Sequence, residues 1–383
     1  STAVWRLSLE YTSKLDANLY LIPWPKPFED TNIDLSEIVN TQFGYYTLRN
    51  EKIDIVWYTH SRTSHIYKIC KFLKMPQLNQ LFCQIKLIGG GKNYDVIYVG
   101  FDMHLLPLAL FRLVGWVKTP IFVLSHFSYS TKYTDSRWKK IYKKIERFFV
   151  YKAIDKISFA CESLLEIAKE DYHIPIRHYN VANWGANLSF YNRGLYKQQL
   201  PNGDYFVAAG GMNRDYSTLI EAFRYIDLKK PGVKIFSKYR DYTKGQLLPP
   251  NISFENLMDG CSYYEAYVKL RYHYYNSIAI LLPIDHANDV PNGATVLVEA
   301  LAMGIPIVIT EADTNYIDVE KEGVGLTVKR HDVDGWINAI NFLVDNPQKV
   351  KSMGENAYLL AKSKYNDQSF ANNILMQMKH VNN

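Results

Sequence analysis

Short β-rich runs alternate with helical segments along most of this 383-residue chain. In the first half, strands are expected at residues 53–58, 95–99, 121–125, 156–160 and 177–181, and helices at 35–48, 104–117, 135–151 and 162–171. Strands that alternate with helices are typical of α/β folds, in which each helix crosses over between two parallel strands. The beginning of the series stays open, because residues 4–9 and 18–22 both qualify as the first strand.

A second alternating series occupies the other half of the chain. Its expected strands are residues 205–209, 233–236, 278–282 and 326–328, and its expected helices are 217–225, 263–274, 334–344 and 368–381. Residues 183–201 contain the Asn, Gly and Pro typical of a connection. Because 383 residues exceed one ordinary core, we expect two doubly wound α/β domains, at 1–184 and 185–365. The last helix, at about 366–383, has no strand after it and is expected to pack back on the first domain.

The bulk composition excludes several classes of protein. With 48% hydrophobic and 21% charged residues, the chain is typical of a globular protein. The longest apolar run, residues 105–117, is too short to span a bilayer and contains Arg112. The first residues lack the basic start and apolar run of a signal peptide, and the four cysteines show no metal-ligand or disulfide spacing. We therefore expect a cytoplasmic protein without a bound metal.

The stretch PNGATVLVEALAMGIPIVIT, residues 291–310, combines the start of a helix with a buried strand. Small residues would leave the first amides of this helix open, and such amides bind anions together with the helix dipole. Glu299 follows Thr295 by about one turn, where its carboxylate can accept hydrogen bonds from sugar hydroxyls. An anion site beside a site for a diol is what a nucleotide diphosphate requires. The alternative is a buried helix with a solvated acid.

A second strand–turn–helix pattern occurs in YFVAAGGMNRDYSTLIEAF, residues 205–223. Gly210 and Gly211 allow the backbone to approach a ligand closely. Arg214 offers a planar, permanently charged donor group for phosphate. Parallel sheets bind ligands beyond the carboxyl ends of their strands, so this turn is a candidate site, although glycines at a strand end are also ordinary turn residues.

The segments NGATVLVEALAMGIPIVIT, RDYSTLIEAF and EGVGLTV together resemble the C-terminal domain of GT-B glycosyltransferases. They are most similar to the retaining family 4, glycosyl transferases group 1. The resemblance covers residues 205–345 well and the first half only in outline, and it implies two Rossmann-like domains that face a central cleft. The donor-binding residues that it implies, with Glu299 on the ribose, are Gly210, Gly211, Arg214, Lys238, Asn292, Gly293, Ala294, Thr295 and Glu299.

Two positions depart from the motifs of this family. Gly-Gly stands where the family usually has Gly-Arg, so one phosphate-binding cation is missing, and Lys238 or Arg240 is its expected replacement. Pro291 occupies the place of a glutamate that commonly lies near the donor sugar. Asp289 or Asp285 in the same loop can serve instead, and Asp289 is our catalytic candidate.

His126 is the second catalytic candidate, at the end of the expected strand in TPIFVLSHFSYS. Residues that follow a buried parallel strand face ligands, and the resembling family often has a histidine near the donor sugar at an equivalent place. A neutral imidazole there can bond a sugar hydroxyl and stabilise positive character at the anomeric carbon. A structural histidine is the equal alternative.

Basic residues are concentrated in residues 132–152, KYTDSRWKKIYKKIERFFVYK. Apolar residues recur in this segment at helical spacing, so one apolar face is expected to pack. The basic side is either a solvated surface or a peripheral contact with anionic lipid, to which each basic residue would contribute about 1 kcal/mol. No motif supports nucleic-acid binding. The residues of the candidate membrane or acceptor surface are Arg137, Lys139, Lys140, Lys143 and Lys144.

The sequence therefore predicts a glycosyltransferase that moves a sugar from a UDP- or GDP-linked donor to a glycan or lipid-linked acceptor. This activity would serve polysaccharide or glycoconjugate biosynthesis, in the cytoplasm or at the inner face of the membrane. The resemblance implies retention of the anomeric configuration, and amides with Arg214 would stabilise the leaving diphosphate without a metal or bound cofactor. Two alternatives stay open: a nucleotide-sugar epimerase or hydrolase on the same fold, and a non-catalytic partner protein.

Overall fold

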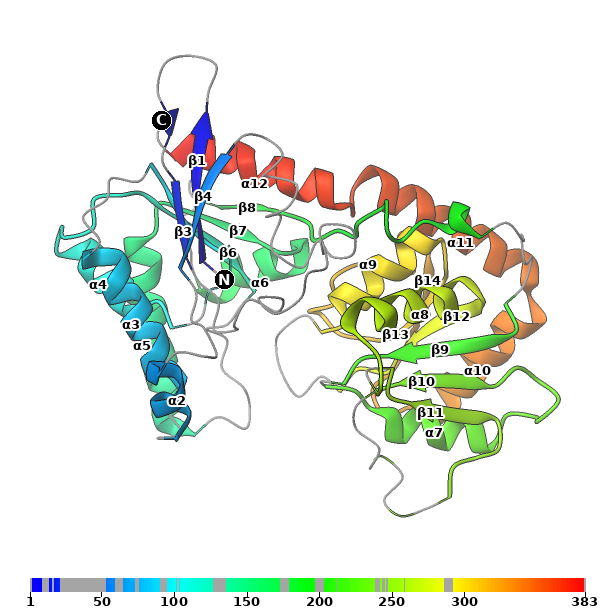
Figure 1. The fold of residues 1–383 in the computed structure, drawn as a ribbon. Helices are drawn as coiled ribbons and strands as arrows, with labels where there is room; N and C mark the ends of the chain where they lie inside the picture. Colours follow the sequence, from blue (N-terminus) through cyan, green and yellow to red (C-terminus); the bar gives the residue numbers. More distant parts are fainter. Residues whose placement is uncertain are drawn as a thin grey trace.

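The computed structural model consists of two α/β domains, one in each half of the chain (Figure 1). The structure describes residues 2–8, 14–15, 17–20, 53–58, 65–72, 76–89, 95–100, 102, 104–126, 136–172, 179–196, 203–211, 213–237, 242, 245, 247–257, 259–285 and 292–381. The helix expected at residues 35–48 lies outside these ranges.

The N-terminal domain contains an eight-stranded sheet in the order β2-β1-β4-β3-β5-β6-β7-β8. Its strands are β1 (Thr2–Ser8), β2 (Lys14–Leu15), β3 (Ala17–Tyr20), β4 (Ile53–Tyr58), β5 (Ile97–Val99), β6 (Ile121–Ser125), β7 (Lys156–Phe159) and β8 (Tyr179–Val181). Both candidates for the first strand are strands. From β4 to β8 the neighbouring strands run parallel.

Strand β1 is the exception to the predicted parallel arrangement. It runs antiparallel to β4, and its shorter pairings with β2, β3 and β5 are also antiparallel. The chain between Ser8 and Ala17 is too short for the crossover of a dozen or more residues that two parallel strands need. The first sheet is therefore mixed at its N-terminal end and parallel from β4 to β8.

Five helices of the described residues flank this sheet. They are α2 (His65–Phe72), α3 (Pro76–Gly89), α4 (Leu106–Leu113), α5 (Arg137–Ala153) and α6 (Glu162–Tyr172). The sequence predicted α4, α5 and α6 to within a few residues, whereas α3 was not anticipated. Figure 1 shows α2 to α5 gathered at the side of the N-terminal domain that is remote from the C-terminal domain.

The C-terminal domain contains a six-stranded parallel sheet in the order β11-β10-β9-β12-β13-β14. Its strands are β9 (Tyr205–Ala209), β10 (Val233–Phe236), β11 (Ile252–Glu255), β12 (Ser277–Leu282), β13 (Ile307–Thr310) and β14 (Gly325–Val328). This is the order 3-2-1-4-5-6 of a doubly wound sheet, which reverses direction between β9 and β12. A ligand site is therefore expected beyond the carboxyl ends of these two strands.

Helices cover both faces of the second sheet. They are α7 (Tyr216–Arg224), α8 (Tyr263–Tyr275), α9 (Ala294–Met303), α10 (Val333–Asp345) and α11 (Pro347–Ser363), followed by α12 (Asp367–Val381). All six residues of β12 are buried, as a strand with helices on both faces requires, and this explains its unbroken apolar sequence.

The chain crosses between the domains twice, and the two crossings pair with each other. The Ala186 amide donates to the Tyr365 carbonyl at 3.0 Å, and the Asp367 amide donates back to the Ala186 carbonyl at 3.0 Å. Beyond this point α12 returns to the first domain and packs against β6 and β7 (Figure 1). There Trp184 and Phe370 make an edge contact with ring centroids 5.3 Å apart.

Candidate active site

Two loops meet where the strand order of the C-terminal sheet reverses. Arg214, in the loop after β9, pairs with Ile284 after β12 in an isolated antiparallel bridge. The Asp215 amide donates to the Pro283 carbonyl at 2.8 Å. The two loops therefore fix each other at the carboxyl edge of the sheet, where open α/β sheets bind ligands.

The Arg214 guanidinium lies against two glycines of this edge. A Cβ atom added to Gly210 would be 2.7 Å from Nη2 of Arg214, and a Cβ added to Gly293 would be 3.6 Å from it. Nε of Arg214 donates to the Ala209 carbonyl at 3.2 Å. Burial lowers the pKa of Arg214, but a guanidinium stays protonated in proteins. One permanent positive charge therefore lies between the end of β9 and the start of α9.

Helix α9 begins with a glycine instead of a capping side chain. The N-cap, Gly293, has a φ of 78°, in the left-handed region that glycine adopts without strain. The amides of residues 294–296 have no acceptor within the helix, because the first turn lacks preceding carbonyls. Asn213 Nδ2 donates to Asn292 Oδ1 at 2.8 Å, which holds the start of α9 to the loop after β9. An anion at this helix start would face the amides, the helix dipole and Arg214 together.

Glu299 lies inside the protein, with 4% of its surface exposed. Tyr191 donates its hydroxyl to Oε1 at 2.6 Å, and Tyr274 donates its hydroxyl to Oε2 at 3.2 Å. Burial raises the pKa of Glu299 to about 7, although the two hydroxyl bonds lower it in part. Each carboxylate oxygen has a second lone pair, so these bonds leave acceptor capacity for a ribose hydroxyl.

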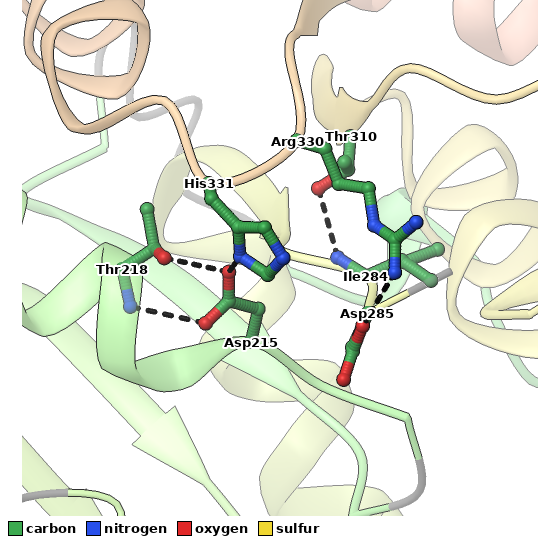
Figure 2. A network of polar contacts seen from close by, with 7 residues as sticks. All are labelled: Asp215, Thr218, Ile284, Asp285, Thr310, Arg330 and His331. Carbon is green, nitrogen blue, oxygen red and sulfur yellow. Dashed lines mark hydrogen bonds and ion pairs between the residues drawn. The ribbon is translucent and has the colours of Figure 1, made fainter. Parts of the chain in front are cut away.

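A network of polar side chains connects the residues that follow β9, β12 and β14 (Figure 2). Asp215 caps α7 by accepting from the Thr218 amide at 3.1 Å, and its other oxygen lies 2.8 Å from Nδ1 of His331, after β14. Arg330 and Asp285 form an exposed ion pair at 3.1 Å. Sequence reasoning missed this network, although the polar segment KRHD directly after β14 was a signal for residues at a ligand-facing edge.

The N-terminal domain presents His126 at the end of β6. A buried aspartate holds this strand end: Ser125 Oγ donates to Asp102 Oδ2 at 2.5 Å, and the His126 amide donates to Oδ1 at 3.0 Å. The His126 ring lies edge-on to Trp184 of the interdomain crossing, with centroids 6.1 Å apart. Burial lowers the pKa of His126 to about 4, although Asp102 raises it in part. The imidazole is therefore neutral at physiological pH, as our interpretation of a sugar-contacting histidine requires.

A second buried acid lies beneath α4. Glu146 of α5 is 3% exposed, and its carboxylate accepts hydrogen bonds from the backbone of Leu106 and Leu105 at the start of α4. Burial and, to a smaller extent, the charge of Asp102 raise the pKa of Glu146 to about 7, although the backbone hydrogen bonds lower it in part. Glu146 thus serves as a cap for a neighbouring helix, a role that a single-helix pattern does not reveal.

Several predicted residues fall outside the described ranges. They are Asp289, Pro291, Lys238 and Arg240. Gly211 lies within these ranges and is partly buried after β9. Asp285, the other candidate for the missing acid, is engaged with Arg330 at the surface.

Comparisons with known proteins fit this geometry. A family model described as Glycosyl transferases group 1 matches residues 264–360, which include α8, α9 and Glu299. The structure is similar to HepE from Anabaena in complex with UDP-glucose, with a TM-score of 0.67 and 15% identity over 95% of this chain and 99% of that chain. The chain therefore has the fold of GT-B glycosyltransferases.

Two further solved structures share this fold. A glycosyltransferase from Rickettsia africae has a TM-score of 0.61 and 12% identity over 95% of this chain and 97% of that chain. A UDP-forming α,α-trehalose-phosphate synthase from Burkholderia vietnamiensis has a TM-score of 0.59 and 14% identity over 88% of this chain and 82% of that chain. A sequence comparison with curated proteins gives no match.

The basic helix α5 is turned opposite to expectation. Its buried residues are Glu146, Val150 and Ala153. Trp138 is 81% exposed and Phe148 is 53% exposed. The prediction that the apolar face of this helix packs is therefore wrong, because burial of the Glu146 cap turns that face outward.

In the described part of the chain, no three His, Cys, Asp or Glu side chains come together as a metal site. Among the described helices, none combines the length and the apolar character needed to cross a bilayer.

Substitution of Gly210 with alanine tests the position of Arg214. Gly210 has a φ of +106°, and the new Cβ would lie 2.7 Å from Nη2 of Arg214, so the guanidinium must move. We expect roughly tenfold weaker nucleoside diphosphate binding by titration calorimetry, as for loss of one charged hydrogen bond. Gly260→Ala is the matched control, because Gly260 has a φ of +73° with nothing within 4 Å. Equal affinities of the two variants would mean that Arg214 does not contact the ligand.

The raised pKa of Glu299 predicts a pH-dependent stability. Because the folded state holds this proton more tightly than the unfolded state, the contribution is complete below pH 4.5 and is lost as pH rises through about 7. The loss is on the order of 3 kcal/mol for a shift of this size. Glu299→Gln should therefore flatten the fall in Tm over this pH window, whereas the exposed control Glu311→Gln should not. An unchanged slope in Glu299→Gln would mean that Glu299 is already ionised in the folded protein at low pH.

Proposed function

We propose that this protein is a glycosyltransferase that transfers a sugar from a nucleoside diphosphate donor, bound at the C-terminal domain, to a hydroxyl of a glycan or lipid-linked acceptor. The observation that carries the proposal is the position of Arg214, whose guanidinium lies against Gly293 at the uncapped start of α9. A diphosphate fits this arrangement because it carries the charge that amides, dipole and guanidinium favour. Glu299, about one turn into α9, would accept from the ribose.

The proposed chemistry uses the same groups to stabilise the leaving group. As the bond between the anomeric carbon and the diphosphate oxygen breaks, negative charge grows on the diphosphate next to Arg214 and the α9 amides. These groups supply that stabilisation without a metal ion, so we propose metal-independent transfer. Neutral His126 would bond a hydroxyl of the donor sugar from the opposite domain. We include retention of the anomeric configuration in the proposal, because the family that the sequence resembles is retaining.

UDP is the donor nucleotide that we favour, with GDP as the alternative. The support is that HepE was solved with UDP-glucose and that the trehalose-phosphate synthase is described as UDP-forming. We place the activity in polysaccharide or glycoconjugate biosynthesis, in the cytoplasm and at the inner face of the membrane. The cytoplasmic leaflet carries anionic lipid, which suits the basic residues of α5.

A thermal-shift panel of nucleoside diphosphates and their sugars tests this proposal. A ligand at 100 times its Kd stabilises the folded state by about 2.7 kcal/mol, which corresponds to roughly 5 °C or more in Tm for a domain of this size. We expect a shift with UDP or GDP, and none with the nucleosides alone. The stabilising donor sugar should then give acceptor-dependent release of nucleoside diphosphate. Release of a free epimer, or binding without turnover on any acceptor, would contradict the proposal.

A further inference from the structure

The outward side of α4 and α5 carries large apolar side chains. We call this surface the α4–α5 face and define it by Val114, Trp116, Trp138, Ile145 and Phe148. Trp116 is 72% exposed and Val114 is 66% exposed, just after the last turn of α4. Helices α4 and α5 pack against each other and lie at the side of the molecule remote from the C-terminal domain (Figure 1). Large exposed apolar side chains on neighbouring helices mark a candidate interaction site.

The arrangement of α5 shows that this exposure is not incidental. Residues 138, 141, 142, 145 and 148 follow the i, i+3, i+4 spacing of one helix face, and all of them are exposed. The opposite side buries the Glu146 carboxylate as the cap of α4. A helix with its apolar stripe in solvent and a fixed acid inside is oriented for a partner beyond the molecule.

Charge decides which partner fits. Glu146 is the one acid of α5, and the other seven charged residues of the helix are basic. The neighbouring helices α2, α3 and α4 contain no Asp or Glu in their sequences. A second copy of the chain would bring a like-charged surface against this one, which is unfavourable. An anionic partner with an apolar interior satisfies both features.

We propose that the α4–α5 face inserts into the interface of an anionic lipid bilayer. Trp116 and Trp138 are suited to the headgroup region, where tryptophan is enriched. Lysines on the same helix keep their charge at the phosphate level while their stems lie along apolar surface. This differs from electrostatic adsorption alone, because the apolar side chains themselves enter the interface.

Docking by this face would bring the membrane to the acceptor side of the enzyme. Strand β6 ends at Ser125, next to His126, and α5 begins at Arg137. In a parallel sheet the helix after a strand begins at the edge where that strand ends. The basic first turns of α5 therefore lie toward the edge that carries His126. This last step rests on the proposed transfer, and the insertion of the α4–α5 face deepens the placement at the membrane that the proposed function already makes.

Vesicle flotation of the full chain tests the inference. The vesicles are phosphatidylcholine alone and a two-to-one mixture of phosphatidylcholine with phosphatidylglycerol. We expect binding to the mixture and little to the neutral vesicles. The double variant Trp138→Ser/Phe148→Ser should lower the partition coefficient by roughly tenfold or more, and Arg137→Gln/Lys144→Gln by about fivefold per residue. Leu228→Ser/Leu359→Ser is the matched control, because both leucines are exposed on the C-terminal domain, at 65% and 61%.

Three results would overturn the inference. The first is no binding of the unmodified chain to anionic vesicles. The second is undiminished binding of the Trp138→Ser/Phe148→Ser variant, which would leave adsorption by charge only. The third is a dimer in sedimentation that this variant converts to a monomer with vesicle binding unchanged. Each variant is also titrated with the stabilising nucleoside diphosphate, and an unchanged Tm shift there separates a failure of docking from a failure of the proposed function.

Discussion

Replacement of Arg214 with alanine should lower kcat/KM for the nucleotide donor by about 100-fold or more, the range for loss of one preorganised charge-stabilising group. The guanidinium lies against Gly210 and Gly293, so it would meet a diphosphate at the start of α9. Negative charge on the diphosphate increases as its bond to the anomeric carbon breaks. The loss of activity should therefore appear in kcat as well as in donor affinity. Arg214→Lys should retain part of the activity, because it keeps the charge without the planar fork.

Arg224→Ala is the matched control for Arg214. Arg224 lies in the last turn of α7 and pairs with Glu221 at 3.1 Å on the surface. Its removal should change donor kinetics little, since exposed ion pairs contribute about 1 kcal/mol or less to stability. If Arg214→Ala folds normally and retains the kinetic constants of Arg224→Ala, the diphosphate does not bind at α9.

Replacement of His126 with alanine should lower kcat by roughly 100-fold, within the range for a positioned polar catalytic group. The imidazole lies at the end of β6, and its pKa is lowered to about 4, so it acts as a neutral hydrogen-bonding group. The pH profile of kcat should accordingly lack a step near 6.5, the ordinary pKa of histidine. The affinity for nucleoside diphosphate alone should stay unchanged, because that part of the donor binds to the other domain.

His273→Ala is the control for His126. His273 on α8 is half-buried, with a pKa that burial lowers to about 4, and its ring nitrogen Nδ1 lies 2.9 Å from the Tyr205 hydroxyl. Its loss should lower Tm without a specific effect on kcat. Equal kcat in the His126 and His273 variants, measured below both Tm values, would show that His126 is structural.

Local patterns in the sequence predicted the architecture because they depend on neighbouring residues. The apolar run of β12 and the Gly-Ala-Thr start of α9 specify a buried strand and an uncapped helix, and the structure has both. Parallel topology then places the ends of β9 and β12 at one edge of the sheet. The sequence alone therefore predicted that Arg214 and Gly293 belong to the same site. Strand β11 and helix α11 were not predicted, because the apolar pattern in each of these segments is short.

Contacts between distant segments could not be predicted in the same way. The bond of Tyr191 to Glu299 joins residues 108 positions apart, and the interdomain crossing that carries Tyr191 has no periodic pattern. The prediction for the orientation of α5 was wrong for a related reason. Helical spacing shows which residues share a face, but the side that faces the protein was decided by Glu146 and its bonds to another helix.

Hydrogen exchange of the intact chain, with and without the nucleoside diphosphate that stabilises it, tests the diphosphate site most directly. We expect slower exchange in peptides that cover residues 209–216 and 292–299, because the ligand would accept from amides at the start of α9. Peptides of the N-terminal sheet, such as residues 97–102, should exchange as before. Saturated binding with unchanged exchange at 292–299, and protection elsewhere, would mean that the diphosphate does not bind at the start of α9.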